Sequence, residues 1–343
     1  MLFLAAIIAV FLGMNWYVLA RLFALWGVDR DRRLFLLLPP LALSAPLALA
    51  LEAGVGNALT GGFALLAMTW LGLCFLLLWI LLVQQLLSRL FRLPRRVWAV
   101  AVCGTAAALL FLAAINARIV TVRRETIPGL PLRIAHLSDI HLGSIGERML
   151  AEIVDRTNDL RPDLVLITGD LFDNANPTTR AAAARLKGFT APVFFSSGNH
   201  ETYAGFDRVR EMLAGSGIRW LRNEAVESGG IRILGLDDSR TTDRLQEALE
   251  RLPPSRAFTV LLNHQPVGFD LAVRHRVNLT LSGHVHSGQI WPFGYLVALL
   301  YPRGVGLHAV GESFLNVSAG TGYWGPPLRL GSRSEIVLLE PAP

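Results

Sequence analysis

The stretch Leu164–Asp173 reads LVLITGDLFD, and it indicates how the C-terminal part of the chain folds. Its first five residues are apolar or β-branched, which is the composition of a buried strand. Gly169 and Asp170 end this run, so a polar side chain follows directly at the carboxyl end of the strand. Because α/β sheets place their binding and catalytic residues in such loops, the stretch predicts a buried strand that leads into a functional site.

Seven more short runs with a similar composition lie on both sides of this stretch. They are Leu132–Leu137, Val193–Ser196, Ile231–Leu236, Phe258–Leu262, Asn278–Leu281, Phe314–Ser318 and Ile336–Leu339. Helical patterns fall between several of them, for example Arg148–Asp159 and Thr179–Lys187. Strands that alternate with helices predict a layered α/β domain.

Five of the eight predicted strands end in Asp, Asn or His. The five segments are Ser138–His141, Gly169–Asp173, Gly198–Glu201, Asn263–Pro266 and Gly283–His286. Asp139 and His141 are two residues apart, as are His284 and His286, so each pair points to one side of an extended chain. Carboxylate oxygen and imidazole nitrogen without sulfur suit Mn, Fe or Zn. The segments therefore predict a hydrolytic site for two metal ions.

The histidines of these segments are interpreted as a set. One histidine taken alone is more often solvated or hydrogen-bonded than a metal ligand, but here five lie at strand ends beside Asp, Asn or another His. His136, His275 and His308 lie outside the segments, and we expect them to be structural. Gly169, Gly198 and Gly283 precede candidate ligands, so we expect tight turns and a close approach of backbone there.

Apolar residues are concentrated near the N-terminus. Hydrophobic residues make up 52% of the chain and charged residues only 17%, which is apolar for a soluble protein. Four stretches without charge open the sequence: Met1–Ala20, Leu34–Leu51, Ala53–Ser88 and Val97–Ala117. Since about 20 apolar residues cross a bilayer as a helix, residues 1–117 predict an all-α transmembrane bundle of about four helices. A cleaved signal peptide is disfavoured for the first stretch, because a basic start is missing and further spans follow.

The second stretch is the marginal one, because Pro39, Pro40 and Pro46 would kink it or leave it only partly in the membrane. After the fourth stretch, residues 118–131 end in Pro128-Gly129-Leu130-Pro131 and are interpreted as a linker. Residues 132–343 then form the predicted α/β domain.

Positive charge accompanies the apolar stretches. Residues 1–131 carry 11 Arg, no Lys and 4 acidic residues, a net of +7; the chain totals of 32 and 26 leave 21 basic and 22 acidic residues, a net of −1, for 132–343. Because the excess lies in loops beside predicted spans, we expect a membrane and no nucleic-acid partner. Cys74 and Cys103 both lie in apolar stretches, so a disulfide framework or thiolate site is not expected.

The loops between the stretches alternate in charge. The basic residues are Arg21, Arg30, Arg32 and Arg33 after the first stretch, and Arg89, Arg92, Arg95 and Arg96 after the third. Basic loops favour the cytoplasm, so four spans place both termini outside it. We therefore expect an integral protein of a bacterial inner membrane, with the α/β domain on the periplasmic face. Arg118, Arg123 and Arg124, after the fourth stretch, favour the opposite orientation.

The order of the strand-end segments closely resembles the calcineurin-like metallophosphoesterase superfamily. That family has Asp-x-His, Gly-Asp-x-x-Asp, Gly-Asn-His-Asp/Glu, a single His and Gly-His-x-His in succession, and all five motifs occur here from Asp139 to His286. The similarity continues into Gly288–Ile290 and the tail segments Val317–Gly322 and Pro327–Leu330, and so covers nearly all of residues 132–343. The layout resembles the membrane-anchored subgroup, and it implies a four-layer αββα sandwich after the transmembrane helices.

The resemblance also implies seven ligands for two divalent metal ions, Mn, Fe or Zn, with Mn favoured. One set is Asp139, His141 and His286, the other is Asn199, His264 and His284, and Asp170 would bridge both. A metal-activated hydroxide would attack the phosphate, and His200, oriented by Asp173, would protonate the leaving oxygen. One departure from the family pattern is Ala319-Gly320, where relatives often carry Arg-Gly, which puts a substrate contact from that arginine in question.

The expected function is a membrane-anchored, metal-dependent phosphoesterase that cleaves a phosphomonoester, phosphodiester or pyrophosphate, with lipid-linked substrates among the candidates. A non-catalytic metal-binding scaffold is disfavoured, because such proteins usually lose the acid His or a ligand. An accessory domain of a transporter is disfavoured as well, because transport spans normally carry buried ionisable groups. Here Glu52 is the only acid between the first and last spans outside the first loop. The sequence does not specify the oligomeric state.

An apolar segment, Ile290–Tyr301, follows the last motif and has two readings. It is too short, and too interrupted by Pro292 and Gly294, to be a fifth span. One reading is a loop and helix packed on the domain's own core. The other is an apolar lid beside the metals that rests on the bilayer, where aromatic side chains with a polar edge are favoured.

Overall fold

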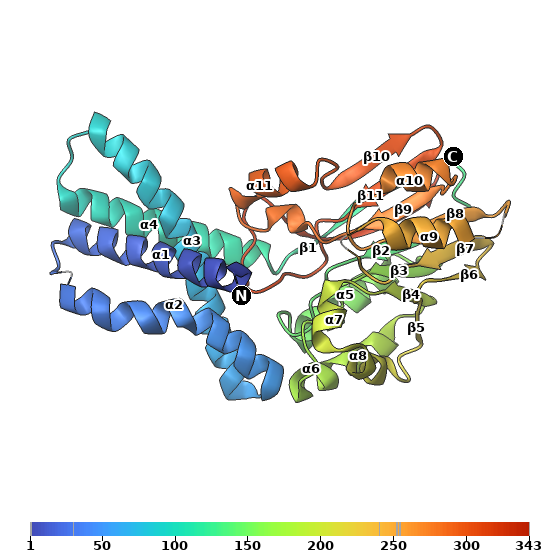
Figure 1. The fold of residues 1–343 in the computed structure, drawn as a ribbon, viewed down its shortest axis with the longest axis horizontal. Coiled ribbons are helices and arrows are strands. Elements are labelled where there is room, and N and C mark those ends of the chain that lie inside the picture. Colours follow the sequence, from blue (N-terminus) through green and yellow to red (C-terminus); the bar gives the residue numbers. More distant parts are fainter. Residues whose placement is uncertain (1, 30, 240, 252, 254, 343) are drawn as a thin grey trace. The chain divides into compact units, whose positions relative to one another are not determined.

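A computed structural model describes residues 2–29, 31–239, 241–251, 253 and 255–342 (Figure 1). The chain divides into two compact units. The first comprises Met1–Ile115 and Gly325–Leu328, and the second comprises Asn116–Trp324 and Arg329–Pro343.

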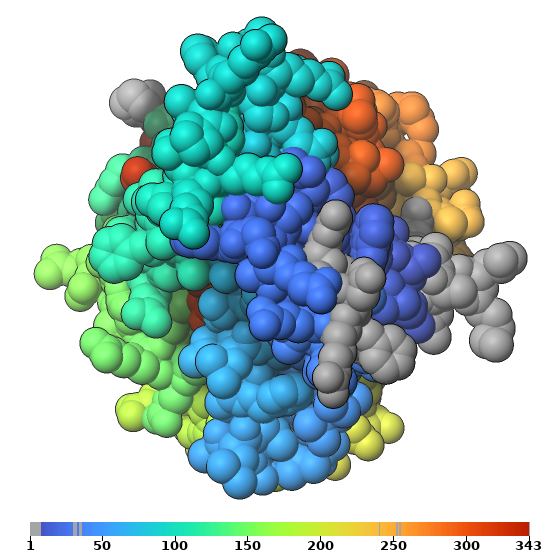
Figure 2. Space-filling model, turned by 90° about the vertical axis from the view of Figure 1, so that its left-hand side faces the viewer, coloured from blue at the N-terminus to red at the C-terminus, as the bar shows by residue number. Residues whose placement is uncertain are grey.

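Helices α1 to α4 make up most of the first unit. Their bounds are α1 Leu2–Trp26, α2 Asp31–Gly54, α3 Ala58–Leu90 and α4 Arg95–Asn116. All four are long and apolar enough to cross a membrane, which confirms the prediction of about four apolar helices. With 33 residues, α3 is about 50 Å long and exceeds the hydrocarbon core of a bilayer. In the space-filling view of Figure 2 the described residues of these helices are coloured blue to cyan.

Polar side chains connect α1 to α3 within this apolar unit. The indole Nε1 of Trp70 donates to Oδ1 of Asn15 at 2.9 Å, and the amide of Gln85 donates to the hydroxyl of Tyr17 at 2.6 Å. Such paired groups stabilise contacts between apolar helices, where an unpaired polar atom would be costly. The three prolines of the marginal second stretch lie inside α2, which is assigned as helix from Asp31 to Gly54.

Two six-stranded sheets form the centre of the second unit. One sheet has the order β1-β12-β2-β3-β4-β5 and the other β10-β11-β9-β8-β7-β6. The first sheet contains β1 Val120–Ile127, β2 Ile134–Leu137, β3 Leu164–Thr168, β4 Val193–Ser196, β5 Ile218–Trp220 and β12 Ser334–Pro341. The second contains β6 Glu224–Ser228, β7 Ile231–Gly235, β8 Phe258–Leu262, β9 Leu279–Ser282, β10 Gly306–Val310 and β11 Ser313–Val317. Strands β2, β3 and β4 are parallel, as are β7, β8 and β9.

Helices cover the outer face of each sheet (Figure 1). On the first sheet they are α5 Glu147–Asp159, α6 Pro177–Ala182, η1 Ala183–Gly188, α7 Asn199–Ala204 and α8 Phe206–Leu213. On the second they are α9 Asp243–Arg251 and α10 Phe269–Arg274; the short η2 His286–Gly288 and α11 Phe293–Leu300 follow β9. Three buried clusters separate the resulting layers.

Side chains that alternate between the two faces of each strand form these clusters. In β2, Ile134 packs into the cluster between the two sheets, whereas Ala135 and Leu137 pack against α5. The third cluster joins the second sheet to α9 and α10 through Leu261, Leu249 and Phe269. Successive residues of a strand point to opposite faces, so one strand serves two layers. The four-layer αββα sandwich implied by the family resemblance is confirmed.

All eight predicted strands are present, as β2, β3, β4, β7, β8, β9, β11 and β12. The interpretation of residues 118–131 as a linker is wrong in its central part, because Val120–Ile127 form β1, which pairs in parallel with β12. Charged side chains in β1 hid the strand pattern. They are accommodated because Arg123 forms two hydrogen bonds of 3.1 Å with the carboxylate of Glu335 on β12. Only residues 117–119 therefore lie between α4 and the sheet.

Candidate metal centre

The five polar segments predicted from the sequence meet at the carboxyl ends of both sheets. They follow β2, β3 and β4 of the first sheet and β8 and β9 of the second. Parallel strands end at one edge of a sheet, so each sheet brings its own segments together. The two edges face one another across the cluster between the sheets, as the contacts below show.

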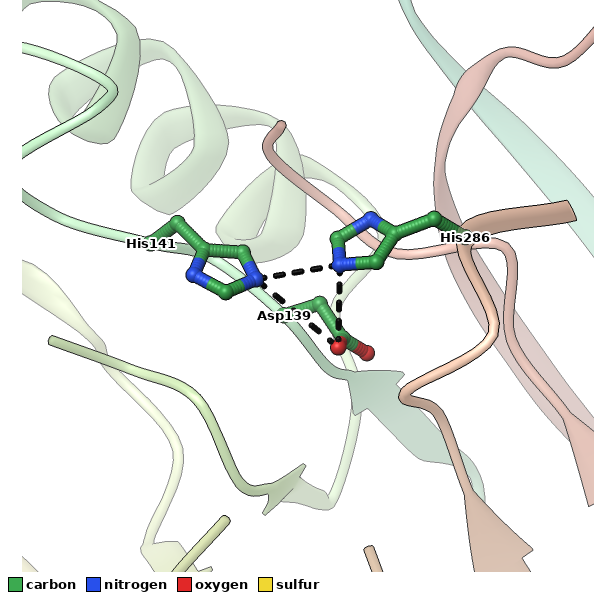
Figure 3. A group of neighbouring side chains, drawn as sticks. All are labelled: Asp139, His141 and His286. Atoms are coloured by element: carbon green, nitrogen blue, oxygen red, sulfur yellow. Dashed lines mark hydrogen bonds and ion pairs between the residues drawn. The ribbon is translucent and has the colours of Figure 1, made fainter. Parts of the chain in front are cut away.

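The first group of side chains contains Asp139, His141 and His286 (Figure 3). The Nε2 atoms of His141 and His286 lie 3.0 Å apart, and Nε2 of His286 lies 3.3 Å from Oδ1 of Asp139. Nε2 of His141 lies 3.9 Å from the same oxygen. Asp139 and His141 are buried. Three potential ligand atoms thus converge in a buried place, as a metal site requires.

The second group contains Asp170, His264 and His284. Nε2 of His264 lies 3.2 Å from Oδ2 of Asp170 and 3.2 Å from Nδ1 of His284. The same carboxylate oxygen of Asp170 lies 3.8 Å from Nε2 of His141 in the first group. Asp170 therefore stands between the two groups, the location that a bridging ligand needs.

Asn199 supplies a direct test of whether these residues fit metal ions. Its side-chain Oδ1 is buried and has no hydrogen-bond partner among the described residues. An unpaired buried acceptor costs about 1–3 kcal/mol, so such an atom calls for an explanation. The neighbouring backbone N–H of His200 donates to Oδ1 of Asp170 at 2.9 Å, which holds this segment at the centre. An unpaired acceptor oxygen in a segment that is held against Asp170 fits a ligand of a divalent cation.

Five candidate ligands have a left-handed backbone. The φ angles are 51° at Asp139, 54° at His141, 51° at Asp170, 69° at His284 and 47° at His286. Residues other than glycine rarely adopt this conformation, and each instance costs on the order of 1–3 kcal/mol. Its concentration at these residues indicates that the fold sustains local strain in order to aim their side chains.

Glycines let the segments approach closely, as predicted. A Cβ atom on Gly283 would lie 1.9 Å from Oγ of Ser138 and 2.1 Å from Oδ2 of Asp139. A Cβ atom on Gly198 would lie 2.2 Å from Oδ1 of Asp170. No side chain fits at either position, so the glycines are required for the contact between the segments rather than for a turn alone.

Asp173 joins the first group to His200. Its Oδ1 lies 2.7 Å from Nδ1 of His141 and 2.9 Å from Nδ1 of His200. An ionised carboxylate only accepts, so both Nδ1 atoms carry the hydrogen and the Nε2 atoms are left to face the site. The carbonyl of Thr168, 2.8 Å from Nδ1 of His264, has the same effect on that ring. Carboxylate or carbonyl partners of this kind are typical of metal-binding imidazoles.

Glu201 is a functional residue whose role the sequence did not reveal. Its buried carboxylate accepts hydrogen bonds from the backbone N–H groups of Asp170, Leu171, Phe172 and Gly198, at distances from 2.7 to 3.0 Å. One side chain therefore holds the segment after β3 against the segment after β4. The only signal was its place in the Gly-Asn-His-Glu motif, which gives no hint of these partners.

Arg329 is a second residue that the sequence analysis did not single out. It is completely buried, and its guanidinium donates to the carbonyl oxygens of Gly322 and Ala319 at 2.7 and 2.9 Å. Its Nη2 lies 3.3 Å from Nδ1 of His286. An arginine thus reaches the site from position 329 although position 319 is alanine. Because it is buried, it supports the loop and ring rather than a substrate.

The histidines of the site differ in the direction in which their surroundings shift the pKa. Burial is the largest cause that lowers the pKa of His286, to about 3, and of His284, to about 4, so both rings are neutral and have a lone pair. Burial also lowers the pKa of His200, but Asp173 and Asp170 outweigh it and raise this pKa to about 9. Burial lowers the pKa of His264 as well, but the nearby Asp170 carboxylate outweighs it and raises this pKa well above its usual value. The carboxylates thus attract positive charge to the centre.

The remaining histidines are outside this centre. His136 is buried, with Nε2 at 2.8 Å from the Thr168 hydroxyl and Nδ1 at 2.7 Å from the Asn316 amide, and is structural as predicted. His308 contacts the carbonyl of Gly304 at 2.7 Å. The nine site residues predicted from the sequence are therefore brought together, and the three excluded histidines are not part of the group. The roles assigned to the nine remain predictions.

Comparison with known proteins agrees with this arrangement. Residues 132–288 match the calcineurin-like phosphoesterase family. An Aquifex aeolicus protein named as an uncharacterized metallophosphoesterase is 33% identical over 235 residues, covering 64% of this chain and 88% of that protein. The chain belongs to the calcineurin-like metallophosphoesterase family.

Two further relatives are longer than the shared region. A Campylobacter jejuni protein named as an uncharacterized metallophosphoesterase is 38% identical over 220 residues, covering 61% of this chain and 59% of that protein. A Bos taurus protein named transmembrane protein with metallophosphoesterase domain is 37% identical over 239 residues, covering 62% and 54%. The chain thus matches little more than half the length of these two proteins.

Proposed function

We propose that this protein is a membrane-anchored phosphoesterase that uses two divalent metal ions. The observation that carries the proposal is the meeting of two donor groups at one carboxylate, Asp170, with an unpaired oxygen of Asn199 beside it. Two cations held in this way would supply Lewis-acid stabilisation of a phosphate and an activated water. A site made of oxygen and nitrogen donors suits Mn, Fe or Zn, and the family resemblance favours Mn among them.

The proposed ligands of one ion are Asp139, His141 and His286, and those of the other are Asn199, His264 and His284, with Asp170 shared. This assignment is supported by the two groups of converging ligand atoms. The Asp139 carboxylate is held in its orientation because both of its oxygens accept a hydrogen bond from the backbone N–H of His284, at 3.0 and 2.9 Å.

His200 is the proposed general acid, with Asp173 as the residue that orients it. The Asp173 carboxylate holds the Nδ1 hydrogen of His200, so the opposite nitrogen is free to give a proton to a leaving oxygen. The rings of Tyr203 and Trp324 flank His200 edge to face, with centroids at 5.3 and 5.6 Å. These rings limit the motion of the imidazole and give the leaving group an apolar neighbour.

The four apolar helices support anchoring in a membrane. We place residues 1–117 in the membrane region and begin the phosphoesterase domain at β1 rather than at residue 132. We propose a bacterial inner membrane, and from the basic loops we propose that the domain lies on its periplasmic face. The substrate is a phosphomonoester, a phosphodiester or a pyrophosphate, and a lipid-linked compound is included among these.

A substrate panel tests this proposal. Full-length protein loaded with Mn would be assayed on nitrophenyl phosphate, bis-nitrophenyl phosphate and a lipid-linked pyrophosphate. We expect hydrolysis of at least one compound, loss of activity with a chelator, and recovery when Mn is returned. His275→Ala, at an exposed histidine outside the centre, serves as the matched control and should retain activity. Failure of the metal-loaded protein on every compound would contradict the proposal.

A further inference from the structure

Helix α11 exposes a continuous apolar surface. None of its residues is buried. We define the α11 surface by its exposed large side chains, which are Trp291, Phe293, Tyr295, Leu296, Leu299 and Leu300. Leu299 is 79% exposed and Tyr295 69%. Soluble proteins rarely expose contiguous apolar patches without a binding partner, so this surface needs an occupant.

The composition of the surface points to lipid as that occupant. The sequence Phe293–Leu300 reads FGYLVALL and contains no charged residue. With 8 residues, α11 is about 12 Å long, too short to cross a hydrocarbon core of about 30 Å. Tryptophan and tyrosine beside leucines are typical of segments that lie in the interface between lipid and water.

Both ends of α11 are fixed to segments that carry candidate ligands. At the start, η2 begins with His286, and a Cβ atom on Gly288 would lie 2.3 Å from the backbone nitrogen of Gly294, so η2 and α11 are in direct contact. At the far end, the ring of Tyr301 lies edge to face with that of His284, with centroids 5.6 Å apart. Both ends of α11 therefore lie beside segments that carry candidate ligands.

The segment that carries Trp291 is also linked to the point where the domain is tethered to the apolar helices. The backbone of Trp291 donates to the carbonyl of Leu330 at 2.7 Å, and four residues later Ser334 pairs with Val120, the first residue of β1. Only residues 117–119 join β1 to the last apolar helix, a path of at most about 14 Å. Trp291 is thus linked through Leu330 and Ser334 to the start of β1, where the chain is tethered to α4.

We propose that the α11 surface docks on the lipid bilayer and presents a phosphate group carried by a membrane lipid to the metal centre. The proposal rests on the proposed function for the chemistry, but the docking itself is a separate property. The bilayer is the occupant because the surface is apolar and uncharged, has interfacial aromatic residues, and lies close to the membrane tether. A second copy of the chain or a protein partner would leave it away from lipid.

The docking is tested by fluorescence quenching in the full-length protein. Leu299→Cys, in a background with Cys74 and Cys103 replaced by alanine, would carry an environment-sensitive fluorophore in vesicles of phosphatidylcholine and phosphatidylglycerol. The control is Asp207→Cys on α8, where the side chain is 90% exposed. Nitroxide-labelled lipids should quench the label at 299 several-fold more than the label at 207. Equal quenching at both positions would overturn the docking, whether or not the protein hydrolyses a phosphate.

A second measurement addresses substrate presentation. Trp291→Ala with Leu299→Asp should reduce turnover of a lipid phosphate embedded in vesicles at least tenfold and leave a soluble nitrophenyl phosphodiester within twofold. Val310→Asp, at an exposed apolar residue of β10, is the matched control and should change neither. Equal loss on both substrates would show that the segment belongs to the domain core. Activity absent in the wild type would instead contradict the proposed function and leave the quenching result to decide the docking.

Discussion

The Oδ1 atom of Asp173 lies 2.9 Å from Nδ1 of His200. The same atom lies 2.7 Å from Nδ1 of His141, so one carboxylate oxygen orients both a candidate metal ligand and the candidate acid. Its second oxygen accepts from the backbone N–H of Ser144 at 2.9 Å, which fixes the carboxylate in place. In the proposed mechanism, metal binding and proton transfer are therefore coupled through one side chain, and substitutions at Asp173 and at His200 should differ in a defined way.

His200→Ala should keep both metal ions and lose turnover. General acid catalysis typically contributes about 10²–10⁴-fold, and the loss should be greatest for substrates with poor leaving groups. A nitrophenyl phosphodiester, whose leaving group needs little protonation, should be affected less. Steady-state rates on both kinds of substrate, with metal content measured in parallel, check this. A loss of only twofold on the unactivated substrate would remove His200 from the role of acid.

Asp173→Asn should impair both metal binding and turnover. The variant keeps the size of the side chain but removes the charge that holds the Nδ1 hydrogens of two histidines. Loss of such a partner typically weakens metal affinity about 10–100-fold. A competitive metal titration would measure this, with His200→Ala as the comparison. If both variants retain wild-type metal affinity, Asp173 acts only on the acid.

Glu201→Gln should destabilise the centre without touching a substrate. An amide replaces a carboxylate that accepts four backbone hydrogen bonds, so at least one buried N–H loses its acceptor, at about 1–3 kcal/mol. Thermal unfolding and metal content should both decrease. Glu211→Gln, in an exposed ion pair with Arg180, is the control and should change stability by less than about 1 kcal/mol. Equal effects of the two substitutions would mean that Glu201 does not organise the site.

Gly283→Ala should abolish metal binding. The added methyl group would overlap Ser138 and Asp139, and the segment that carries His284 and His286 would be displaced from the first strand end. Gly146→Ala is the matched control, because nothing lies within 4 Å of a Cβ atom at that position. Metal analysis of the two purified variants checks the expectation. A metal-loaded Gly283→Ala protein would show that the close approach is not needed.

The membrane orientation can be tested at the C-terminus. The alternating basic loops predict that the phosphoesterase domain lies outside the cytoplasm. A fused reporter that is active only after export should therefore be active, and one that works only in the cytoplasm should be silent. The reverse pattern would assign more weight to Arg118, Arg123 and Arg124 and would direct the search to substrates on the cytoplasmic face.

Local composition was sufficient to predict the strands that are buried on both faces. Leu164–Thr168 is completely buried and continuous in apolar character, so its pattern identifies it without further context. By contrast, the inner residues of β1 alternate between partly exposed and exposed, and three of its residues are charged. One of them, Arg123, pairs with Glu335, 212 residues away. A contact over that separation leaves no signal in a local window. The strands β5, β6 and β10 were missed because each has at most five residues and none of these is buried, so no continuous buried run marks them.

In the site, too, local patterns were predicted and contacts between distant segments were not. Short spacings such as Asp139 to His141 indicate metal ligands because both candidate residues lie within one short segment, where the pattern is visible in the sequence. Glu201 and Arg329 act through backbone atoms of other segments, and no spacing in the sequence encodes those partners. The prediction therefore found the residues that face the centre and missed those that hold its loops together.

Metal analysis of the purified full-length protein and of Asp170→Ala tests the central claim most directly. The wild type should contain about two transition-metal ions per chain, because two donor groups meet at Asp170. Asp170→Ala should lose both ions together with activity, since its carboxylate serves each group. One ion in the wild type, or full occupancy in the variant, would contradict the account.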